Sequence, residues 1–290
     1  MKNIKELKIE YYENFDLTNY CTWKSGCKTD YIFYPKNINE LKKILSTKKN
    51  YYILGNGSNT LFISLKDTII ISTKKLNNID INGKFVIADS GATLSMVMNK
   101  CLDNNLIGFE FSTGIPGTIG GGLITNAGAN GGTISDKLIS IYMLKNDKEV
   151  EIPKEDIRFS YRTSSIKKND VITRAKFLLT PGDPNVSRKK IKEYLKHRNK
   201  TQPVRWPSAG SVFKNPLPEH AGFIIEKLGI KGEKVGDAEV SDIHANYIIN
   251  KKNAKPFEIN KLIKKVRKRV LEKTGINLEY EVRIVDYDQD

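Results

Sequence analysis

Cysteine is scarce in this sequence, which has three cysteines in 290 residues. An odd, sparse set argues against a disulfide framework and is typical of a reducing compartment. Cys21 and Cys27 stand too far apart for a CxxC redox or zinc pair, and Cys101 is remote from both in sequence. We therefore expect no disulfide.

Metal-binding patterns and long apolar runs are also missing. His197, His220 and His244 form neither an HxxxH nor an HExxH pair, so no metal site is predicted. No apolar run approaches the roughly 18 residues that span a bilayer. The N-terminal segment MKNIKELKIEYYENF lacks the apolar core of a signal peptide. We expect a cytoplasmic protein with no membrane partner.

Negative charge is in short supply, since the formal net charge is +15. A strongly basic chain raises the possibility of a nucleic-acid partner. The lysines, however, are spread along the chain among asparagine and isoleucine. We therefore favour solvated basic faces and expect no nucleic acid. An intermediate interpretation is that the charge favours small anionic ligands such as nucleotides.

Glycine is abundant in one segment, residues 111–136, which holds eight of the chain's 21 glycines in 26 residues. Ordering glycine costs more conformational entropy than ordering any other residue. The segment is therefore either a flexible linker or a surface against which a ligand lies. A shorter glycine turn, GNGSN, follows an apolar strand at residues 55–59.

The familiar phosphate-binding fingerprints do not explain these glycines. The stretch LGNGSNT has Thr60 where a dinucleotide fingerprint has its third glycine, and no GxxxxGK[ST] occurs. Turns that tolerate positive φ can nevertheless present successive N–H groups to an anion. Three such turns occur: GNGSN, GIPGTIGGG and NAGANGG. One alone would be an ordinary β-turn, but three favour a long, diphosphate-bearing ligand.

Hydrophobic periodicity predicts alternating helices and strands in the first part of the chain. Apolar residues at helical spacing predict a helix from Ile38 to Leu45, and Thr93 is the expected N-cap of another. Strands are predicted over 67–73 and 84–91.

The remaining two parts differ in character. The region around the glycine stretch is predicted to be mostly β, with a connecting helix over 187–201. The third part is predicted to contain a helix over Pro256–Thr274 that Gly275 stops. The last segment, NLEYEVRIVD, alternates strictly and predicts a strand.

Taken in order, these motifs resemble the UDP-N-acetylenolpyruvoylglucosamine reductase family over nearly the whole chain. They are ILGNGSN, FEFSTGIPGTIGGGLITNAGANGG, FSYRTSS, PSAGSVFKNP, AGFIIEKLGIKGEKVGDAEVSDIHANYIIN and LEYEVR. The resemblance implies an α+β chain with a vanillyl-alcohol-oxidase-type (PCMH-type) FAD-binding fold. It implies two FAD subdomains over 1–75 and 76–201 and a UDP-sugar domain over 202–290. The short TPGDPNVS connection resembles the subclass without an extra tyrosine loop.

The resemblance also implies an activity. FAD is the cofactor, NADPH is the co-substrate, and an enolpyruvyl UDP-sugar is reduced to UDP-N-acetylmuramate for peptidoglycan synthesis. The positions that match the family's FAD loops are Leu54, Gly55, Asn56, Gly57, Ser58, Asn59, Gly114, Ile115, Pro116, Gly117, Thr118, Gly120, Gly121, Asn126, Ala127 and Gly128. We expect a monomer.

Three residues match the family's catalytic positions. Ser211 matches the proton donor, and Arg162 matches the arginine that contacts the substrate carboxylate and the developing enolate. Glu281 matches the carboxylate that polarises the enolpyruvyl group. The expected substrate contacts are Tyr161, Arg162, Lys200, Asn215 and His244.

The chain departs from the family pattern at a few positions. Cys27 stands in place of the second glycine of a usual Gly-Gly pair, Asn56 interrupts a usual GGGSN loop, and Asp286 ends the VRIVD segment. One alternative is another flavoenzyme of the same FAD fold that acts on a sugar or alcohol. The third part of the chain discriminates between the two, because GSVFKNP and the final EVR belong to the reductase pattern.

Overall fold

The computed structural model describes residues 4–167 and 170–287 of the chain. These residues divide into two compact units that are each discontinuous in sequence. Unit 1 takes the chain up to Glu13 and the ranges Tyr31–Asn56 and Thr68–Lys196; unit 2 takes Asn14–Asp30, Gly57–Asp67 and the chain from His197 onward. Segments far apart in sequence therefore build each unit.

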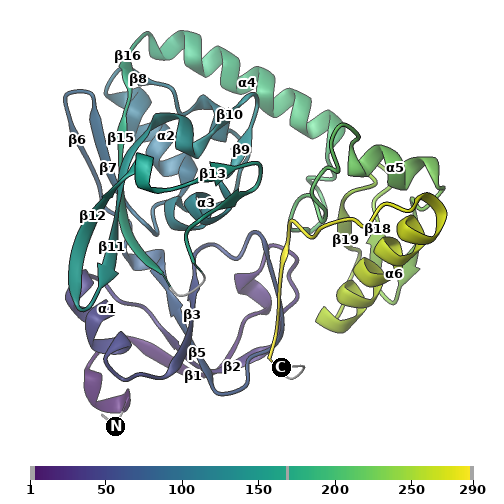
Figure 1. The fold of residues 1–290 in the computed structure, drawn as a ribbon, viewed down its shortest axis with the longest axis horizontal. Coiled ribbons are helices and arrows are strands. Elements are labelled where there is room, and N and C mark those ends of the chain that lie inside the picture. Colours follow the sequence, from purple (N-terminus) through teal and green to yellow (C-terminus); the bar gives the residue numbers. More distant parts are fainter. Residues whose placement is uncertain (1–3, 168–169, 288–290) are drawn as a thin grey trace. The chain divides into compact units, whose positions relative to one another are not determined.

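A four-stranded sheet in the order β1-β2-β5-β3 belongs largely to unit 1 (Figure 1), although one end of β1 and one end of β2 are assigned to unit 2. Its strands are β1 (Tyr11–Asp16), β2 (Lys28–Phe33), β3 (Asn50–Leu54) and β5 (Thr68–Ser72). Strands β2 and β3 both run parallel to β5, which is buried along its whole length. Helix α1 (Ile38–Leu45) buries Leu41 and Ile44 in the same cluster as Ile69 and Ile71.

A five-stranded antiparallel sheet forms the second layer of unit 1, in the order β12-β11-β15-β7-β6. Its strands are β6 (Ile79–Asn82), β7 (Phe85–Asp89), β11 (Leu138–Lys145), β12 (Lys148–Pro153) and β15 (Val171–Leu178). Helices α2 (Leu94–Asp103) and α3 (Ile119–Thr125) supply apolar side chains to the core that this sheet shares. The core is a single cluster of buried aliphatic and phenylalanine side chains.

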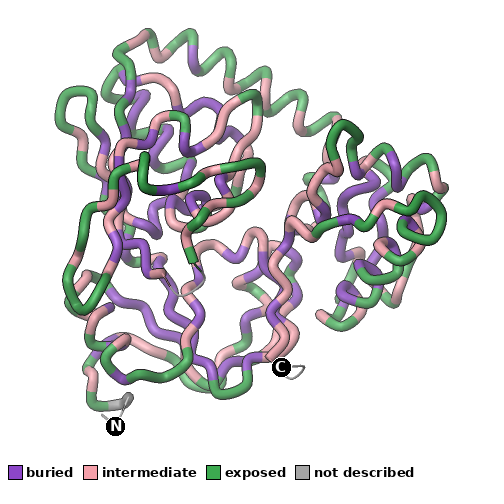
Figure 2. The backbone as a smooth tube through the Cα atoms, viewed as in Figure 1, coloured by how far each residue is buried: buried purple, intermediate pink, exposed green. Residues whose placement is uncertain are grey.

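Short strand pairs and a long helix complete unit 1. The pairs are β8 (Leu106–Ile107) with β16 (Thr180–Pro181), β9 (Gly128–Ala129) with β10 (Gly132–Thr133), and β13 (Phe159–Ser160) with β14 (Thr163–Ser164). Helix α4 (Pro184–Thr201) begins in unit 1 and is exposed along most of its length (Figure 2). Single 3-10 turns are η1 (Ile4–Leu7), η2 (Thr18–Tyr20), η3 (Thr73–Lys75), η4 (Glu110–Ser112), η5 (Ile134–Lys137) and η6 (Lys154–Asp156).

Unit 2 is built around helix α6 (Pro256–Thr274) and a small antiparallel sheet. The sheet consists of β17 (Lys234–Val235), β18 (Ala238–Val240) and β19 (Ile248–Asn250), and α5 (Ala221–Lys227) also packs on α6. A separate parallel pair joins β4 (Thr60–Ser64) to β20 (Arg283–Asp286). Buried side chains from both regions, including Leu61 and Ile263, belong to one core cluster.

Local sequence signals predict the helices well. Helix α1 contains the apolar residues whose spacing predicted it, and α2 begins after Thr93, whose side chain accepts a hydrogen bond from Met96 N at 3.2 Å. Helix α6 spans the predicted range, and Gly275 follows it in the left-handed conformation at φ 74°. These signals are local, so sequence alone reveals them.

Two predictions need correction. The glycine stretch was expected to form turns in a β region, but its IGGGLIT segment is helix α3, which Thr118 caps. The last segment was expected to be one strand, but only Arg283–Asp286 forms β20. The preceding residues instead pair with another segment, since Lys214 N donates to Glu279 O at 2.9 Å. A change of partner thus shortens the strand.

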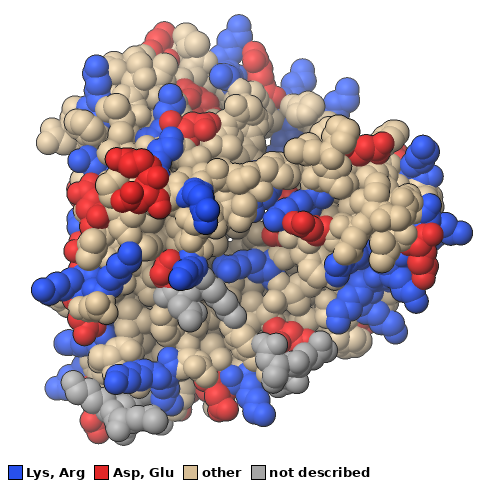
Figure 3. All heavy atoms as spheres, in the orientation of Figure 1, with Lys and Arg blue, Asp and Glu red and all other residues tan. Residues whose placement is uncertain are grey.

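Charge on the face drawn in Figure 3 is dispersed, with acidic side chains between the basic ones. In unit 2, Lys265 and Arg269 of α6 both pair with Glu233, at 2.6 and 3.1 Å. Among residues 4–167 and 170–287, no helix is long and apolar enough to cross a membrane.

Gly57 provides a test of backbone packing in unit 2. It has φ +61°, and an added Cβ would lie 1.9 Å from the carbonyl oxygen of Tyr20. We predict that Gly57→Ala lowers the unfolding free energy of the apoprotein by about 3 kcal/mol or more, measured by urea denaturation. Gly83 is the control, since it has φ +57° but nothing within 4 Å. Gly83→Ala should cost only the conformational strain, about 1–2 kcal/mol. Equal losses for both variants would contradict the packing argument.

Candidate functional site

Two of the predicted glycine segments lie side by side in unit 1. A Cβ on Gly55 would lie 2.5 Å from Thr118 Oγ1, so a larger residue would require the Thr118 side chain to shift. Asn56 Nδ2 donates to Pro116 O at 2.7 Å and joins the two segments directly. The residue that interrupts the expected glycine run therefore supplies a hydrogen bond between the segments. The structure brings these predicted cofactor residues together.

The glycines of α3 permit close packing. A Cβ on Gly120 would lie 3.0 Å from Ser90 Cβ, and one on Gly122 would lie 3.1 Å from Ile134 Cδ1. Their N–H groups are used within the chain: Gly120 N donates to Ser90 O at 2.8 Å, and Gly121 N donates to Thr118 Oγ1 at 3.3 Å. The sequence predicted N–H donors for an anion here. Because these N–H groups are already engaged, Gly120 and Gly121 would contact a ligand through van der Waals packing of their Cα atoms, which carry no side chain.

Two buried polar atoms near these segments lack a hydrogen-bond partner within the described part of the chain. They are Ser90 Oγ and Asn126 Oδ1. Ser90 follows β7 and accepts from Gly120 with its carbonyl group. Asn126 ends α3 at φ 45°, and its Nδ2 donates to Ser160 O at 3.0 Å. A buried polar atom without a partner is costly, so a bound ligand would satisfy these groups favourably.

Arg162 occupies the turn of the β13–β14 hairpin in unit 1. Ser160 and Thr163 pair across the turn, so Tyr161 and Arg162 are its two central residues. Arg162 has φ 55°, which is uncommon for a residue with a side chain and is typical of tight hairpin turns. Its Nη1 atom lies 3.3 Å from where a Gly128 Cβ would stand, and its guanidinium lies 5.6 Å from the centre of the Tyr161 ring. Arg162 is thus held against the third predicted glycine turn.

In unit 2, the second half of the first glycine loop contacts the C-terminal segment. Asn59 Nδ2 donates to Glu281 O at 3.0 Å, and Arg283 N donates to Asn59 O at 2.9 Å. Asn59 was predicted from the sequence as a cofactor residue. Its amide also fixes the backbone of Glu281, a predicted catalytic residue that lies 222 positions away in sequence.

Ser211 and Glu281 are brought together by their backbones. Ser211 forms an antiparallel bridge with Tyr247, while Glu281 N donates to Val212 O at 2.8 Å. The next residue along, Phe213, forms an antiparallel bridge with Tyr280. The segment that carries Ser211 therefore lies between two partners, one of which carries Glu281.

His244 lies in the same unit and is held in one tautomer. Its Nδ1 accepts from Asn246 N at 3.2 Å, so a neutral ring carries its proton on Nε2. Burial lowers the pKa of His244, a backbone hydrogen bond opposes that shift, and nearby Lys231 lowers it further. The ring lies 4.8 Å from that of Tyr247. A neutral imidazole can offer Nε2–H as a donor to an uncharged ligand group.

The other two predicted substrate residues differ in their surroundings. Asn215 Oδ1 accepts from Ala221 N at 3.1 Å and so caps the start of α5. Its Nδ2 lies 3.1 Å from His220 Nδ1. Lys200 is exposed in the last turn of α4. Sequence patterns did not signal the capping role, because the partner backbone becomes a neighbour only after folding.

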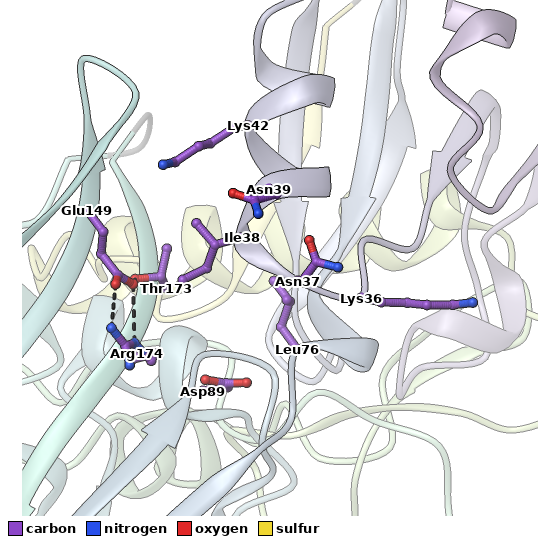
Figure 4. Close-up of a pocket in the computed structure, with 10 residues that line it drawn as sticks. All are labelled: Lys36, Asn37, Ile38, Asn39, Lys42, Leu76, Asp89, Glu149, Thr173 and Arg174. Carbon is purple, nitrogen blue, oxygen red and sulfur yellow. Dashed lines mark hydrogen bonds and ion pairs between the residues drawn. The ribbon is translucent and has the colours of Figure 1, made fainter.

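Unit 1 also contains a pocket of about 500 Å³ that none of the predicted residues lines (Figure 4). Several of its polar groups have partners in the chain. Thr173 Oγ1 donates to Glu149 Oε1 at 2.6 Å, Arg174 pairs with the same carboxylate, and Asp89 accepts from Asn78 N at 3.0 Å. Burial raises the pKa of Asp89. Glu149, Thr173, Arg174 and Asp89 are thus engaged with the chain itself.

The part of the chain that the structure describes contains no group of three or more histidine, cysteine, aspartate or glutamate residues that could hold a metal ion. The cysteines are free thiols, and burial raises the pKa of both Cys21 and Cys101 to about 12. Neither buried thiol is a nucleophile near neutral pH.

Comparisons with known proteins match both halves of the chain. A family model described as "FAD binding domain" matches residues 29–151. A model described as "UDP-N-acetylenolpyruvoylglucosamine reductase, C-terminal domain" matches residues 202–285.

Similar whole proteins carry the same name. The chain is 40% identical over 288 residues to a UDP-N-acetylenolpyruvoylglucosamine reductase of Clostridium novyi, with 96% of this chain and 93% of the relative covered. A Caldicellulosiruptor bescii relative is 41% identical, with 97% and 93% covered. The solved reductase of Thermus caldophilus is 28% identical, with a TM-score of 0.83 and coverage of 96% and 99%. The predicted α+β fold, with a two-subdomain FAD-binding region and a C-terminal domain, is confirmed.

The bond between the glycine segments gives a testable expectation. Asn56→Ala removes the amide that holds Pro116 O, so the dissociation constant for FAD should rise about 2- to 10-fold. Titration of FAD fluorescence with apoprotein measures this. Asn104→Ala is the matched control, because the Asn104 side chain likewise donates to a backbone carbonyl in unit 1, Lys100 O at 2.8 Å. If both variants bind FAD as tightly as the unsubstituted chain, the inter-segment bond has no role in the site.

Proposed function

The chain belongs to the UDP-N-acetylenolpyruvoylglucosamine reductase family and is an FAD-dependent oxidoreductase, and from this premise we propose that it uses NADPH to reduce UDP-N-acetylglucosamine enolpyruvate to UDP-N-acetylmuramate. The product is a precursor for peptidoglycan synthesis. The observation that carries the proposal is the placement of Ser211 and Glu281 on adjacent backbone segments, with Glu281 N donating to Val212 O at 2.8 Å.

The residues of unit 1 fit FAD. Gly55 and Asn56 lie against the second glycine segment, and Ser90 Oγ and Asn126 Oδ1 are buried groups that a ligand would satisfy. We propose that these residues, with the other predicted loop positions, hold the cofactor. Bound there, FAD would supply the hydride-transfer chemistry of the reaction.

Ser211 is proposed as the group that protonates the other carbon. A serine hydroxyl is a very weak acid, so it must be held firmly and exchange its proton with water. The backbone arrangement supports this role, because the residue after Ser211 is bonded on both sides. Val212 N donates to Asn246 O at 2.8 Å, and Val212 O accepts from Glu281 N.

Arg162 is proposed to stabilise the negative charge that develops on the substrate, and Glu281 is proposed to polarise the enolpyruvyl group in its protonated form. A guanidinium can hold two carboxylate oxygens at once, and its charge then favours the enolate. The turn conformation of Arg162 at φ 55° and its position against Gly128 support a fixed orientation. Tyr161, Lys200, Asn215 and His244 are proposed to bind the rest of the UDP-sugar.

We also propose three subdivisions over 1–75, 76–201 and 202–290, a monomer, and a cytoplasmic location. The rival is a flavoprotein oxidase or dehydrogenase that acts on another sugar or alcohol. It is not favoured, because the match over 202–285 is to a reductase C-terminal domain.

Purified protein should be yellow and should oxidise NADPH only when the enolpyruvyl UDP-sugar is present. The assay follows NADPH absorbance with and without that sugar, and with NADH in place of NADPH as a second comparison. NADPH oxidation that depends only on oxygen, or turnover of a simple alcohol, would favour the rival flavoenzyme. A colourless protein that takes up no FAD would contradict the proposal outright.

Ser211→Ala tests the proton donor separately from the cofactor chemistry. Reduction of the bound flavin by NADPH should be nearly unchanged, whereas its reoxidation by the enolpyruvyl sugar should slow by about 10²- to 10⁴-fold, the usual contribution of a positioned acid. Stopped-flow absorbance measures both steps. Ser208→Ala, three positions upstream, is the control and should reoxidise normally. Equal behaviour of the two variants would remove Ser211 from this role.

A further inference from the structure

Asn246 is a buried polar residue, 3% exposed, that sequence analysis gave no role. It lies in unit 2 between His244 and Tyr247, in the loop that precedes β19. A buried amide must satisfy both its oxygen and its nitrogen to avoid a large desolvation cost. The partners of Asn246 are therefore informative about what the residue does.

The side chain of Asn246 forms hydrogen bonds with both backbone polar groups of a single residue, Phe213. Oδ1 accepts from Phe213 N at 3.0 Å, and Nδ2 donates to Phe213 O at 2.8 Å. These atoms lie 33 positions away in sequence. The pairing copies the two hydrogen bonds of a neighbouring strand, so the side chain replaces a strand at this point.

The backbone of Asn246 adds two further hydrogen bonds, one to the neighbouring segment and one to His244. Its carbonyl accepts from Val212 N at 2.8 Å, and its N–H donates to His244 Nδ1 at 3.2 Å. On its other side, Val212 O accepts from Glu281 N. Asn246 thus bonds both His244 and the segment of Ser211. It is linked to Glu281 through one intervening residue, Val212.

We propose that Asn246 is a positioning residue for the reaction: its amide fixes the backbone of residues 212–213 and thereby sets the position of Ser211 relative to Glu281. This inference rests on the proposed function, since it needs Ser211 and Glu281 to act on the substrate. Asn246 itself touches neither hydroxyl nor carboxylate in the interactions described above. It acts through Val212 and Phe213.

The geometry distinguishes positioning from general stability. A small displacement of a reacting group costs much more in rate than in binding, about 10²-fold for 1 Å. The Asn246 N–H that fixes His244 belongs to the backbone, so a side-chain substitution leaves that bond available. We therefore expect substitution at Asn246 to slow proton delivery while leaving the affinity for the UDP-sugar nearly intact.

Asn246→Asp is the sharpest test, because it keeps the shape and the acceptor for Phe213 N but places an oxygen against Phe213 O. Reoxidation of the reduced flavin by the enolpyruvyl sugar should slow about 10- to 100-fold. Flavin reduction by NADPH should change by no more than about twofold, and so should the dissociation constant of UDP-N-acetylmuramate, read from the shift in flavin absorbance.

The chain offers a matched control in Asn250, which is 2% exposed in the same unit. Its Nδ2 donates to Trp23 O at 2.9 Å and its Oδ1 accepts from Ala254 N at 2.9 Å. Its amide is thus also satisfied on both its oxygen and its nitrogen, but its side chain bonds Trp23 and Ala254 rather than the segment of Ser211. Asn250→Asp should lose stability without a selective loss of flavin reoxidation.

The outcomes separate the two levels of inference. If the unsubstituted holoenzyme is not reoxidised by the enolpyruvyl sugar, the proposed function fails. If it is reoxidised, and Asn246→Asp and Asn250→Asp behave alike in both half-reactions, the positioning role is overturned. Should Asn246→Asp not fold, Asn246→Ser is measured in its place, since its short hydroxyl can bond only one Phe213 group. The same selective loss is then expected, and normal reoxidation in that variant overturns the proposal.

Discussion

The backbone of residues 211–214 must satisfy its buried polar groups on two sides at once, and the arrangement of unit 2 depends on how it does so. One side takes Asn246 and Tyr247; the other takes residues 279–282. Buried N–H and C=O groups are rarely left unpaired, so neither partner can move freely without a large cost. The partner on one side follows His244 in sequence, and the partner on the other side contains Glu281. The backbone hydrogen bonds of residues 211–214 therefore set the spacing between these predicted site residues.

The same constraint explains why unit 2 recruits segments from the beginning of the chain. Strand β4 gives β20 a parallel partner, and Asn59 continues that pairing by accepting from Arg283 N and donating to Glu281 O. Trp23 Nε1 donates to Ile248 O at 2.7 Å and so ties the N-terminal loop to β19. A loop that begins as part of a predicted cofactor motif thus ends as a support for the C-terminal segment.

Sequence analysis predicted those features that local chemistry determines. Periodicity and caps gave α1, α2 and α6, because the signals lie within a few residues of each element. It was wrong about α3, since glycine is a poor helix former and only tertiary contacts, such as Gly120 against Ser90, explain its use there. It missed Asn246, because an asparagine's partners 33 positions away leave no local pattern. The sequence singled out the glycine loops, but it did not reveal why position 57 must be glycine, which is the close approach of its backbone to Tyr20 O.

A serine that must act as an acid needs help that its own side chain cannot provide. Its low acidity means that the rate depends on how often the hydroxyl lies in line with the substrate carbon. A network made of backbone bonds suits that need, since peptide groups have no rotamer freedom to lose. It also makes the residues interdependent: Asn246, Val212 and Glu281 share bonds, so disturbing one of them moves the others. Effects of substitutions within such a network do not add, and a residue that never touches substrate can limit the reaction as strongly as one that does.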